Sequence, residues 1–275
     1  MKHTFSRVAI TLLCAAGLSQ AALAGDVKAK LAKLADGEHR SEAYKARNAS
    51  RNPTETLAWF GLKPHMTVVE ISPGGGWYTE ILAPFLKEKG TFYAAHNNPE
   101  SSSEYARKSA AKFREKLAAN ADIYGNVKVT VLELPDHTEA APAGSADMVV
   151  TFRNVHSWMR RDSAEGMFKV MYSMLKPGGV LGLVTHRAGP EGAPAPKGQA
   201  GYVEQADVLK FAEAAGFKLA DSSEINANPK DTKDHPGGVW SLPPNYRKVE
   251  EADKAKYTAM GESDRMTLKF MKPAE

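Results

Sequence analysis

Cysteine is almost absent from this chain. Cys14 is the only one among 275 residues, and it lies in an N-terminal apolar segment. The sequence after that segment therefore offers no disulfide, no thiolate nucleophile and no cysteine ligand for a metal. The 8 histidines form no H-E-x-x-H spacing, so a metal site has no support. The lack of a G-x-S-x-G motif argues against a serine hydrolase.

An excess of one charge is also lacking. The chain has 36 Lys and Arg against 32 Asp and Glu, and both signs are spread along it. No run of basic residues marks a surface that tracks phosphates, so we expect no nucleic-acid partner. Beyond the N-terminus no apolar stretch is long enough to span a bilayer, so we expect no integral membrane segment after cleavage. With 43% hydrophobic and 25% charged residues, the composition is globular and excludes collagen-like, coiled-coil and mainly disordered chains.

The first 24 residues have the pattern of a secretory signal peptide. Lys2 and Arg7 give a positive start, Val8–Leu18 is an apolar core, and Ala22–Ala24 is an A-x-A cleavage site. The apolar core is well short of the ~20 residues that a spanning helix needs. We therefore expect an exported protein, either periplasmic or secreted, from which residues 1–24 are removed.

Short branched segments alternate with helical segments along the rest of the chain. Strands are expected at residues 66–71, 91–95, 127–132, 147–152 and 180–184, with two more near 217–220 and 265–270. This order predicts an α/β fold with a doubly wound, mostly parallel seven-stranded sheet. Asn52 is expected to cap a helix that starts at Pro53, and residues 176–179 are expected to form a turn.

Three regions are expected after the signal peptide pattern is set aside. Residues 25–62 read as an N-terminal helical arm, and residues 63–275 as the domain that holds the sheet. An insertion at about 226–263, between the last two strands, is rich in Pro, Asp and Lys. Insertions of that size beside a sheet are more often lids than linkers, so we expect it to cover a substrate.

A glycine-rich turn follows the first expected strand. Glu70 lies on the strand, and the turn contains Ser72, Gly74, Gly75 and Gly76. Glycines let a ligand approach the backbone, and ligands of parallel sheets bind where the strands end. A nicotinamide-binding turn has a third glycine and an acid ~20 residues downstream. Here Thr79 takes the place of that glycine and the acid precedes the turn, which disfavours a nicotinamide oxidoreductase.

This pattern resembles motif I of the class I S-adenosylmethionine-dependent methyltransferases, in which an acid precedes three glycines at alternate positions. Glu70, Gly74 and Gly76 match that motif, and Ser72 stands in for the first glycine. The resemblance implies that Glu70 interacts with the aminoacid end of the cofactor, often through water. Further segments are similar to the family's strand four with its loop, its turn into strand five and its helix before strand six: Ala146–Trp158, Leu175–Gly179 and Tyr202–Phe217.

The resemblance covers about residues 40–273. In more detail, residues 51–57, 73–78 and 261–273 are similar to a group of exported, methyltransferase-like bacterial proteins. It implies a Rossmann-like methyltransferase fold, S-adenosylmethionine as cofactor, and methyl transfer to a small molecule or an envelope component. The alternative is a catalytically inactive exported binding module with the same fold.

Two positions depart from the family pattern. The family's acid after strand two usually holds the ribose hydroxyls, and here His96 and Asn97 stand at that place. The Asn97 amide could bond one hydroxyl but is a poorer acceptor than a carboxylate; the alternative is that both are turn residues before Pro99. On the adenine side, Asp136 or Glu133 could accept from the adenine amine, or be a solvated loop acid.

The loop after the fourth expected strand is dense in polar groups. In the family the methyl acceptor lies beside this loop. We expect His156 to be the general base, because its ordinary pKa of ~6.5 suits that role. Asn154 is expected to orient the acceptor. Arg153 is expected to bind the cofactor or to orient an acidic acceptor; the alternatives are a structural ion pair for Arg153 and a backbone-bonded loop histidine for His156.

Overall fold

The computed structural model describes residues 25–189, 198 and 200–274. The expected signal peptide, residues 1–24, lies outside the described residues. Within the part of the chain that is described, no helix is both long enough and apolar enough to cross a membrane.

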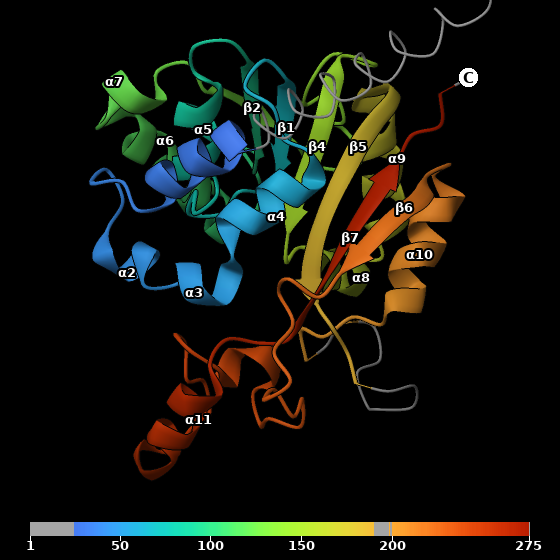
Figure 1. The fold of residues 1–275 in the computed structure, drawn as a ribbon. Coiled ribbons are helices and arrows are strands. Elements are labelled where there is room, and N and C mark those ends of the chain that lie inside the picture. The colour runs from blue at the N-terminus through green and yellow to red at the C-terminus, as the bar shows by residue number, and fades with distance from the viewer. Residues whose placement is uncertain (1–24, 190–197, 199, 275) are drawn as a thin grey trace, which may run out of the picture.

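One seven-stranded sheet organises the chain, in the order β3-β2-β1-β4-β5-β7-β6 (Figure 1). Its strands are β1 (Thr67–Ile71), β2 (Thr91–His96), β3 (Lys128–Val131), β4 (Ala146–Phe152), β5 (Leu175–His186), β6 (Lys218–Ser223) and β7 (Arg265–Met271). Strands β1 to β5 pair in parallel, and β7 runs antiparallel between β5 and β6. The expected doubly wound, mostly parallel α/β fold is confirmed, and its strand order reverses between β1 and β4.

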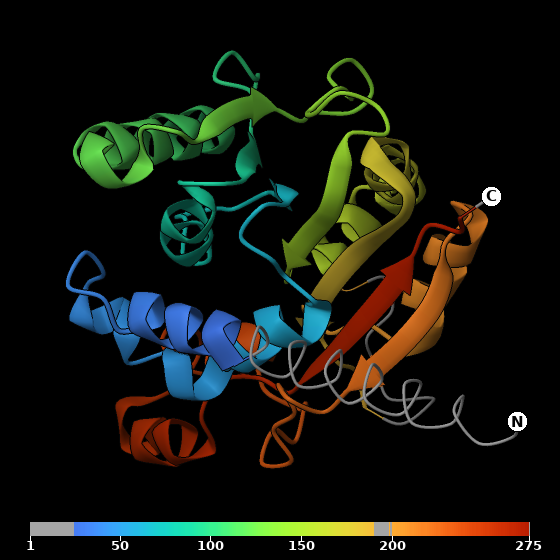
Figure 2. The same ribbon diagram turned by 45° about the horizontal axis from the view of Figure 1, so that its top comes forward.

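Helices cover both faces of this sheet (Figures 1 and 2). The N-terminal arm is helical at residues 25–35 and then forms α2 (Glu42–Lys45), α3 (Asn48–Arg51) and α4 (Pro53–Phe60). The helices between strands are α5 (Thr79–Leu86), α6 (Glu104–Ala118), α7 (Ala121–Tyr124), α8 (Val155–Arg160), α9 (Ala164–Met174) and α10 (Gln205–Ala214). The insertion holds η2 (Gly238–Ser241), η3 (Glu251–Asp253) and α11 (Lys254–Met260).

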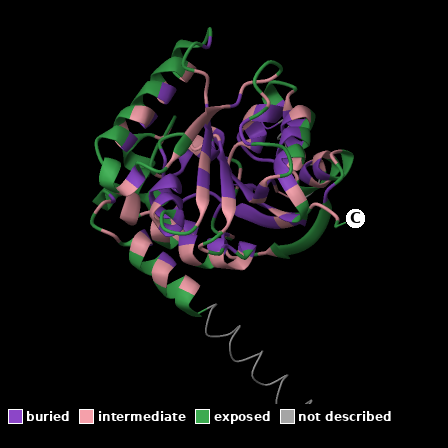
Figure 3. Cartoon of the chain, turned by 90° about the horizontal axis from the view of Figure 1, so that it is seen from above, coloured by how far each residue is buried: buried purple, intermediate pink, exposed green. Residues whose placement is uncertain are grey.

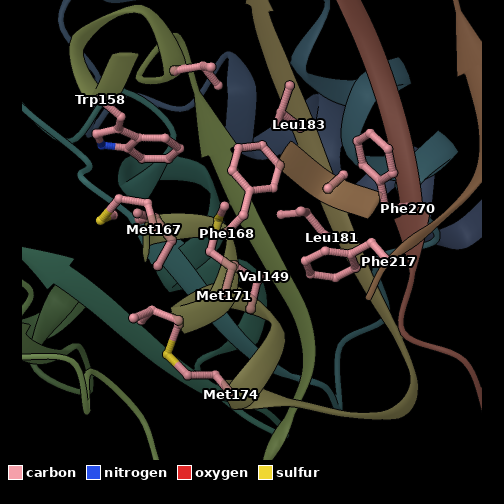
Figure 4. Packing of buried hydrophobic residues seen from close by; sticks show 14 of the residues in the cluster. Val149, Trp158, Met167, Phe168, Met171, Met174, Leu181, Leu183, Phe217 and Phe270 are labelled. Carbon is pink, nitrogen blue, oxygen red and sulfur yellow. The ribbon is translucent and has the colours of Figure 1, made fainter. Parts of the chain in front are cut away.

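Alternate side chains of the central strands supply two hydrophobic cores. Val68 and Val150 pack with the arm, α4, α5 and α6, whereas Val69 and Val149 pack with α8, α9 and α10. Figure 4 shows the second core, in which Phe168 of α9 lies among side chains of β4 and β5. Full burial of such a side chain stabilises the fold by about 1.5–3 kcal/mol. The buried residues gather in the centre of the molecule (Figure 3). The strand ends above these cores are therefore held on a rigid support.

Two local expectations were wrong. Asn52 precedes α4, but its side chain makes no cap: its Nδ2 donates to the carbonyl oxygen of Ile225, 2.7 Å away. Asn52 also has a left-handed backbone, with φ of 40°. Residues 176–179, where a turn was expected, belong to β5 instead. Leu175 already pairs with Ala146 of β4, and the four residues after it form an irregularity in the strand before pairing resumes at Val180.

The insertion is fixed to the sheet by a buried carboxylate. Asp231 accepts hydrogen bonds from the Tyr202 hydroxyl at 2.8 Å and from the backbone N–H of Asp264 at 2.8 Å, and it contacts His235 Nε2 at 2.8 Å. These contacts order the segment beyond the ends of β5 and β7, where α11 projects from the sheet (Figure 1). Through them the insertion brings Trp240 to the same end of the sheet as the glycine turn.

Candidate functional site

A pocket of about 300 Å³ lies where β1 and β4 end, at the point where the strand order reverses. Open α/β sheets bind ligands at this place. The lining comes from the arm, the glycine turn, the loop after β4, the end of β5 and the insertion: Tyr44, Arg47, Arg51, Ser72, Pro73, Gly74, Gly75, Trp77, Phe152, Arg153, Asn154, His156, His186 and Trp240.

The glycine turn presents its backbone to this pocket. Ser72, Gly74 and Gly76 all have left-handed φ angles, of 52°, 59° and 80°. Ser72 thus adopts the conformation that usually needs glycine, at the position where the family motif has one. A Cβ placed on Gly74 would meet nothing within 4 Å, so the missing side chain leaves open space. At Gly76 a Cβ would lie 3.1 Å from the Phe113 ring, so that glycine serves packing.

Glu70 lies beneath the turn and does not line the pocket. It is only 2% exposed, and its Oε2 accepts a hydrogen bond from the Thr79 hydroxyl at 2.6 Å. Burial raises the pKa of Glu70 to about 7. Its carboxyl group therefore braces the start of α5 against β1, and the structure gives it no direct path to the pocket.

The loop after β4 is tied to the loop after β1 by Asn154. Its Nδ2 donates to the carbonyl oxygen of Ile71 at 3.0 Å and to Thr151 Oγ1 at 3.0 Å. The Nδ2 donor is therefore engaged in hydrogen bonds within the protein, and the Oδ1 atom is the part of the amide left to contact a ligand. Arg153, next to it, has φ of 64° and lines the pocket.

His156 is buried in the pocket wall. Its ring centroid lies 5.6 Å from that of His186 and 5.7 Å from that of Trp240. Burial, together with the charges of Arg160 and Arg153, lowers the pKa of His156 to about 4. The ordinary pKa that motivated its prediction as a base therefore does not hold here. At neutral pH the ring is uncharged, and its Nδ1 has no hydrogen-bond partner among the described residues.

The expected ribose and adenine contacts lie apart from this pocket. The Asn97 backbone N–H donates to His96 Nδ1 at 2.8 Å, so Nε2 carries the proton and donates to the Gly74 carbonyl at 3.0 Å. His96 therefore supports the glycine turn, with its ring stacked on Phe113. The Asn97 side chain and the exposed Asp136 do not line the pocket. Glu133 accepts from Asn98 and Ser101 within its own loop.

The arm supplies pocket residues that sequence reasoning missed. Arg47 Nε lies 2.5 Å and Arg51 Nε 3.2 Å from the carboxylate of Glu262, which also pairs with Arg265. The Arg51 guanidinium lies 4.7 Å from the centroid of the Trp77 ring. Arg47 and Arg51 are four residues apart, a spacing that places two side chains on the same face of a helix. This spacing was the one signal in the sequence that could have pointed to them. Their partner follows more than two hundred residues later.

The lining of this pocket matches only part of what an adenosyl sulfonium cofactor needs. The open space at Gly74 is a cradle that any side chain would fill, which fits the backbone approach of its aminoacid end. Asn97 and Asn98 come directly after β2, so this loop has no carboxylate at the place of the family's ribose-binding acid. Among the described residues, no group of three or more His, Cys, Asp or Glu side chains could hold a metal ion.

Comparisons with solved structures find the same architecture in several enzymes. A S-adenosylmethionine-dependent methyltransferase from Aquifex aeolicus is 19% identical, with a TM-score of 0.54 over 89% of this chain and 98% of that one. The [4+2]-cyclase SpnF is 14% identical, with a TM-score of 0.57 over 87% and 86%. A geranyl diphosphate C-methyltransferase from Streptomyces coelicolor A3(2), solved with Mg2+, geranyl diphosphate and S-adenosyl-L-homocysteine, is 13% identical, with a TM-score of 0.55 over 87% of each chain.

These similarities define the fold, which is the Rossmann-like fold of class I S-adenosylmethionine-dependent methyltransferases. No protein-family model and no curated protein matches the sequence.

Proposed function

We propose that the chain binds S-adenosylmethionine at the glycine turn and transfers its methyl group to a small molecule or an envelope component. The observation that carries this proposal is the open space at Gly74, which faces a pocket at the junction of β1 and β4. The agreement of Glu70, Ser72, Gly74 and Gly76 with the family motif supports it, as does the shared fold. Export, for which the pattern of residues 1–24 is the support, remains part of the proposal.

The chain's own residues would position the reactants and exclude water. When bound, the cofactor supplies a methyl carbon on a positively charged sulfur, so the transfer needs in-line alignment more than acid or base catalysis. The aromatic rings of Tyr44, Trp77, Phe152 and Trp240 wall the pocket. The neutral His156 accepts a proton only from an acceptor that loses one during transfer.

A second candidate is a binding module that has kept the fold without the reaction. Two observations favour it: Glu70 is covered by Thr79, and His96 is committed to the Gly74 carbonyl where the family has a ribose-binding acid. The fold itself accommodates other chemistry, since SpnF is a [4+2]-cyclase. In this reading the pocket takes a ligand other than the cofactor.

Calorimetric titration of the purified protein with S-adenosylmethionine and S-adenosylhomocysteine separates the two candidates. The methyltransferase proposal expects saturable binding of both ligands. Gly74→Val should abolish it by filling the open space. Gly144→Val is the matched control, because Gly144 has nearly the same φ, 62°, also has nothing within 4 Å of its Cβ position, and lies outside the pocket. No heat with either ligand at millimolar concentration would favour the binding module.

A further inference from the structure

The pocket has an unbalanced positive charge. Three arginines, Arg47, Arg51 and Arg153, line it, and no acidic side chain does so among the described residues. Behind the lining, Glu262 is the one carboxylate that pairs with Arg47, Arg51 and Arg265. Three guanidiniums therefore share a single negative charge, and a fourth, that of Arg153, adds to them.

Arg51 is buried without partners for most of its donors. It is 1% exposed, and neither Nη1 nor Nη2 has a hydrogen-bond partner in the described structure. The Nε of Arg265 is likewise buried and unpartnered. Guanidinium groups stay charged in proteins, and a buried charge without partners is costly. The Trp77 ring offsets part of the cost for Arg51 but satisfies no N–H donor.

Arg153 is the guanidinium best placed to meet a ligand. It is half-buried, lines the pocket, and follows the strand end at which the acceptor is expected. Its side chain has no hydrogen bond or ion pair among the described residues. Its left-handed backbone, with φ of 64°, turns the loop out of β4 at this residue. Non-glycine residues in this region cost energy and gather at functional sites.

We propose that this pocket binds an oxyanion, a phosphoryl or carboxylate group carried by the methyl acceptor. Arg153 and Arg47 would contact the oxyanion, and Arg51 and Arg265 would supply charge from behind. The planar guanidinium fork matches the oxygens of either group. The charge left over after Glu262 suits a phosphoryl dianion best. The role as acceptor rests on the proposed function, whereas the anion site stands on the arginines alone.

The test is a titration of the purified protein with inorganic phosphate, and separately with acetate, at low ionic strength. It is repeated in the presence of saturating S-adenosylhomocysteine. We expect saturable phosphate binding that is tighter than acetate binding and is kept when S-adenosylhomocysteine is present. Arg153→Ala and Arg47→Ala should each weaken phosphate binding by about tenfold or more, because each removes a charge-assisted hydrogen bond. Arg153→Lys should weaken it by less, because lysine keeps the positive charge. Lys108→Ala is the control, because it removes one positive charge from an exposed side chain on α6, outside the pocket.

Each other outcome has a definite meaning. No saturable phosphate or acetate binding by the unaltered protein, or binding that Arg153→Ala leaves unchanged, would overturn the anion site. One-for-one displacement of phosphate by S-adenosylhomocysteine would assign the arginines to the cofactor's own carboxylate and overturn the assignment to the acceptor. Phosphate binding without any binding of S-adenosylhomocysteine would support the anion site and overturn the proposed methyl transfer. Circular dichroism of each variant establishes that it is folded.

Discussion

The Nδ2 atom of Asn154 lies 3.0 Å from the carbonyl oxygen of Ile71. This hydrogen bond joins the ends of β1 and β4, the two strands between which the strand order reverses. The same amide reaches Thr151 Oγ1 at 3.0 Å. Asn154 therefore sets the separation between the glycine turn and the arginine-bearing loop, so it positions the pocket whatever the ligand is.

Replacing Asn154 should loosen this junction. Asn154→Ala leaves the Ile71 carbonyl without its side-chain donor, and we expect the free energy of unfolding to fall by about 1–3 kcal/mol. Urea unfolding followed by circular dichroism measures this. Asn126→Ala is the control, because its Nδ2 also donates to a backbone carbonyl, that of Lys87, but at an exposed site. An equal loss in both variants would contradict the positioning role of Asn154.

Glu262 should be essential to the arginine cluster. Burial alone would raise the pKa of Glu262, but the Arg265 and Arg51 guanidiniums outweigh it and lower that pKa to about 2. Glu262→Gln leaves these cations without a counter-ion, and we expect a loss of about 3–5 kcal/mol in the free energy of unfolding. Chemical denaturation at pH 7 measures it.

The matched control for Glu262 is Glu224→Gln. Glu224 also pairs with an arginine, Arg187, but its side chain is 70% exposed. We expect a loss of less than about 1 kcal/mol there. If the two variants are equally stable, the arginines do not depend on Glu262 for their burial.

The sheet could be predicted from sequence because its signals are local. Segments such as residues 67–71 are short, branched and bounded by proline or glycine, and burial on both faces demands that pattern. The capping role predicted for Asn52 was wrong because the partner of its side chain is distant in the sequence. Its position before Pro53 is that of a cap, but a distant carbonyl, that of Ile225, offers its side chain another partner.

The site could be predicted only where one segment carries it. The glycine turn and the loop after β4 were found because each is a single run that ends a strand. The pairing of Arg47 with Glu262 joins the arm to the segment before β7, and no local pattern announces it. The low pKa of His156 depends on its burial and on the charge of Arg160 and Arg153, which exist only once the chain has folded.

The protonation of His156 should make stability depend on pH. Its pKa is about 4 in the folded protein and ~6.5 in the unfolded chain. Between these values the unfolded chain takes up a proton that the folded protein does not, so the free energy of unfolding falls as the pH falls from 6.5 to 4. The contribution is present in full above pH 6.5 and amounts to about 3 kcal/mol.

The measurement is urea unfolding of wild type and His156→Gln at several pH values from 4 to 7. Glu70, with its pKa raised to about 7, has the opposite dependence, so the difference between the two proteins is the quantity to plot. We expect the stability of wild type relative to His156→Gln to decline steadily as the medium is acidified. A flat difference for His156→Gln would mean that the ring titrates normally and is open to solvent, which would restore it as a base of ordinary strength.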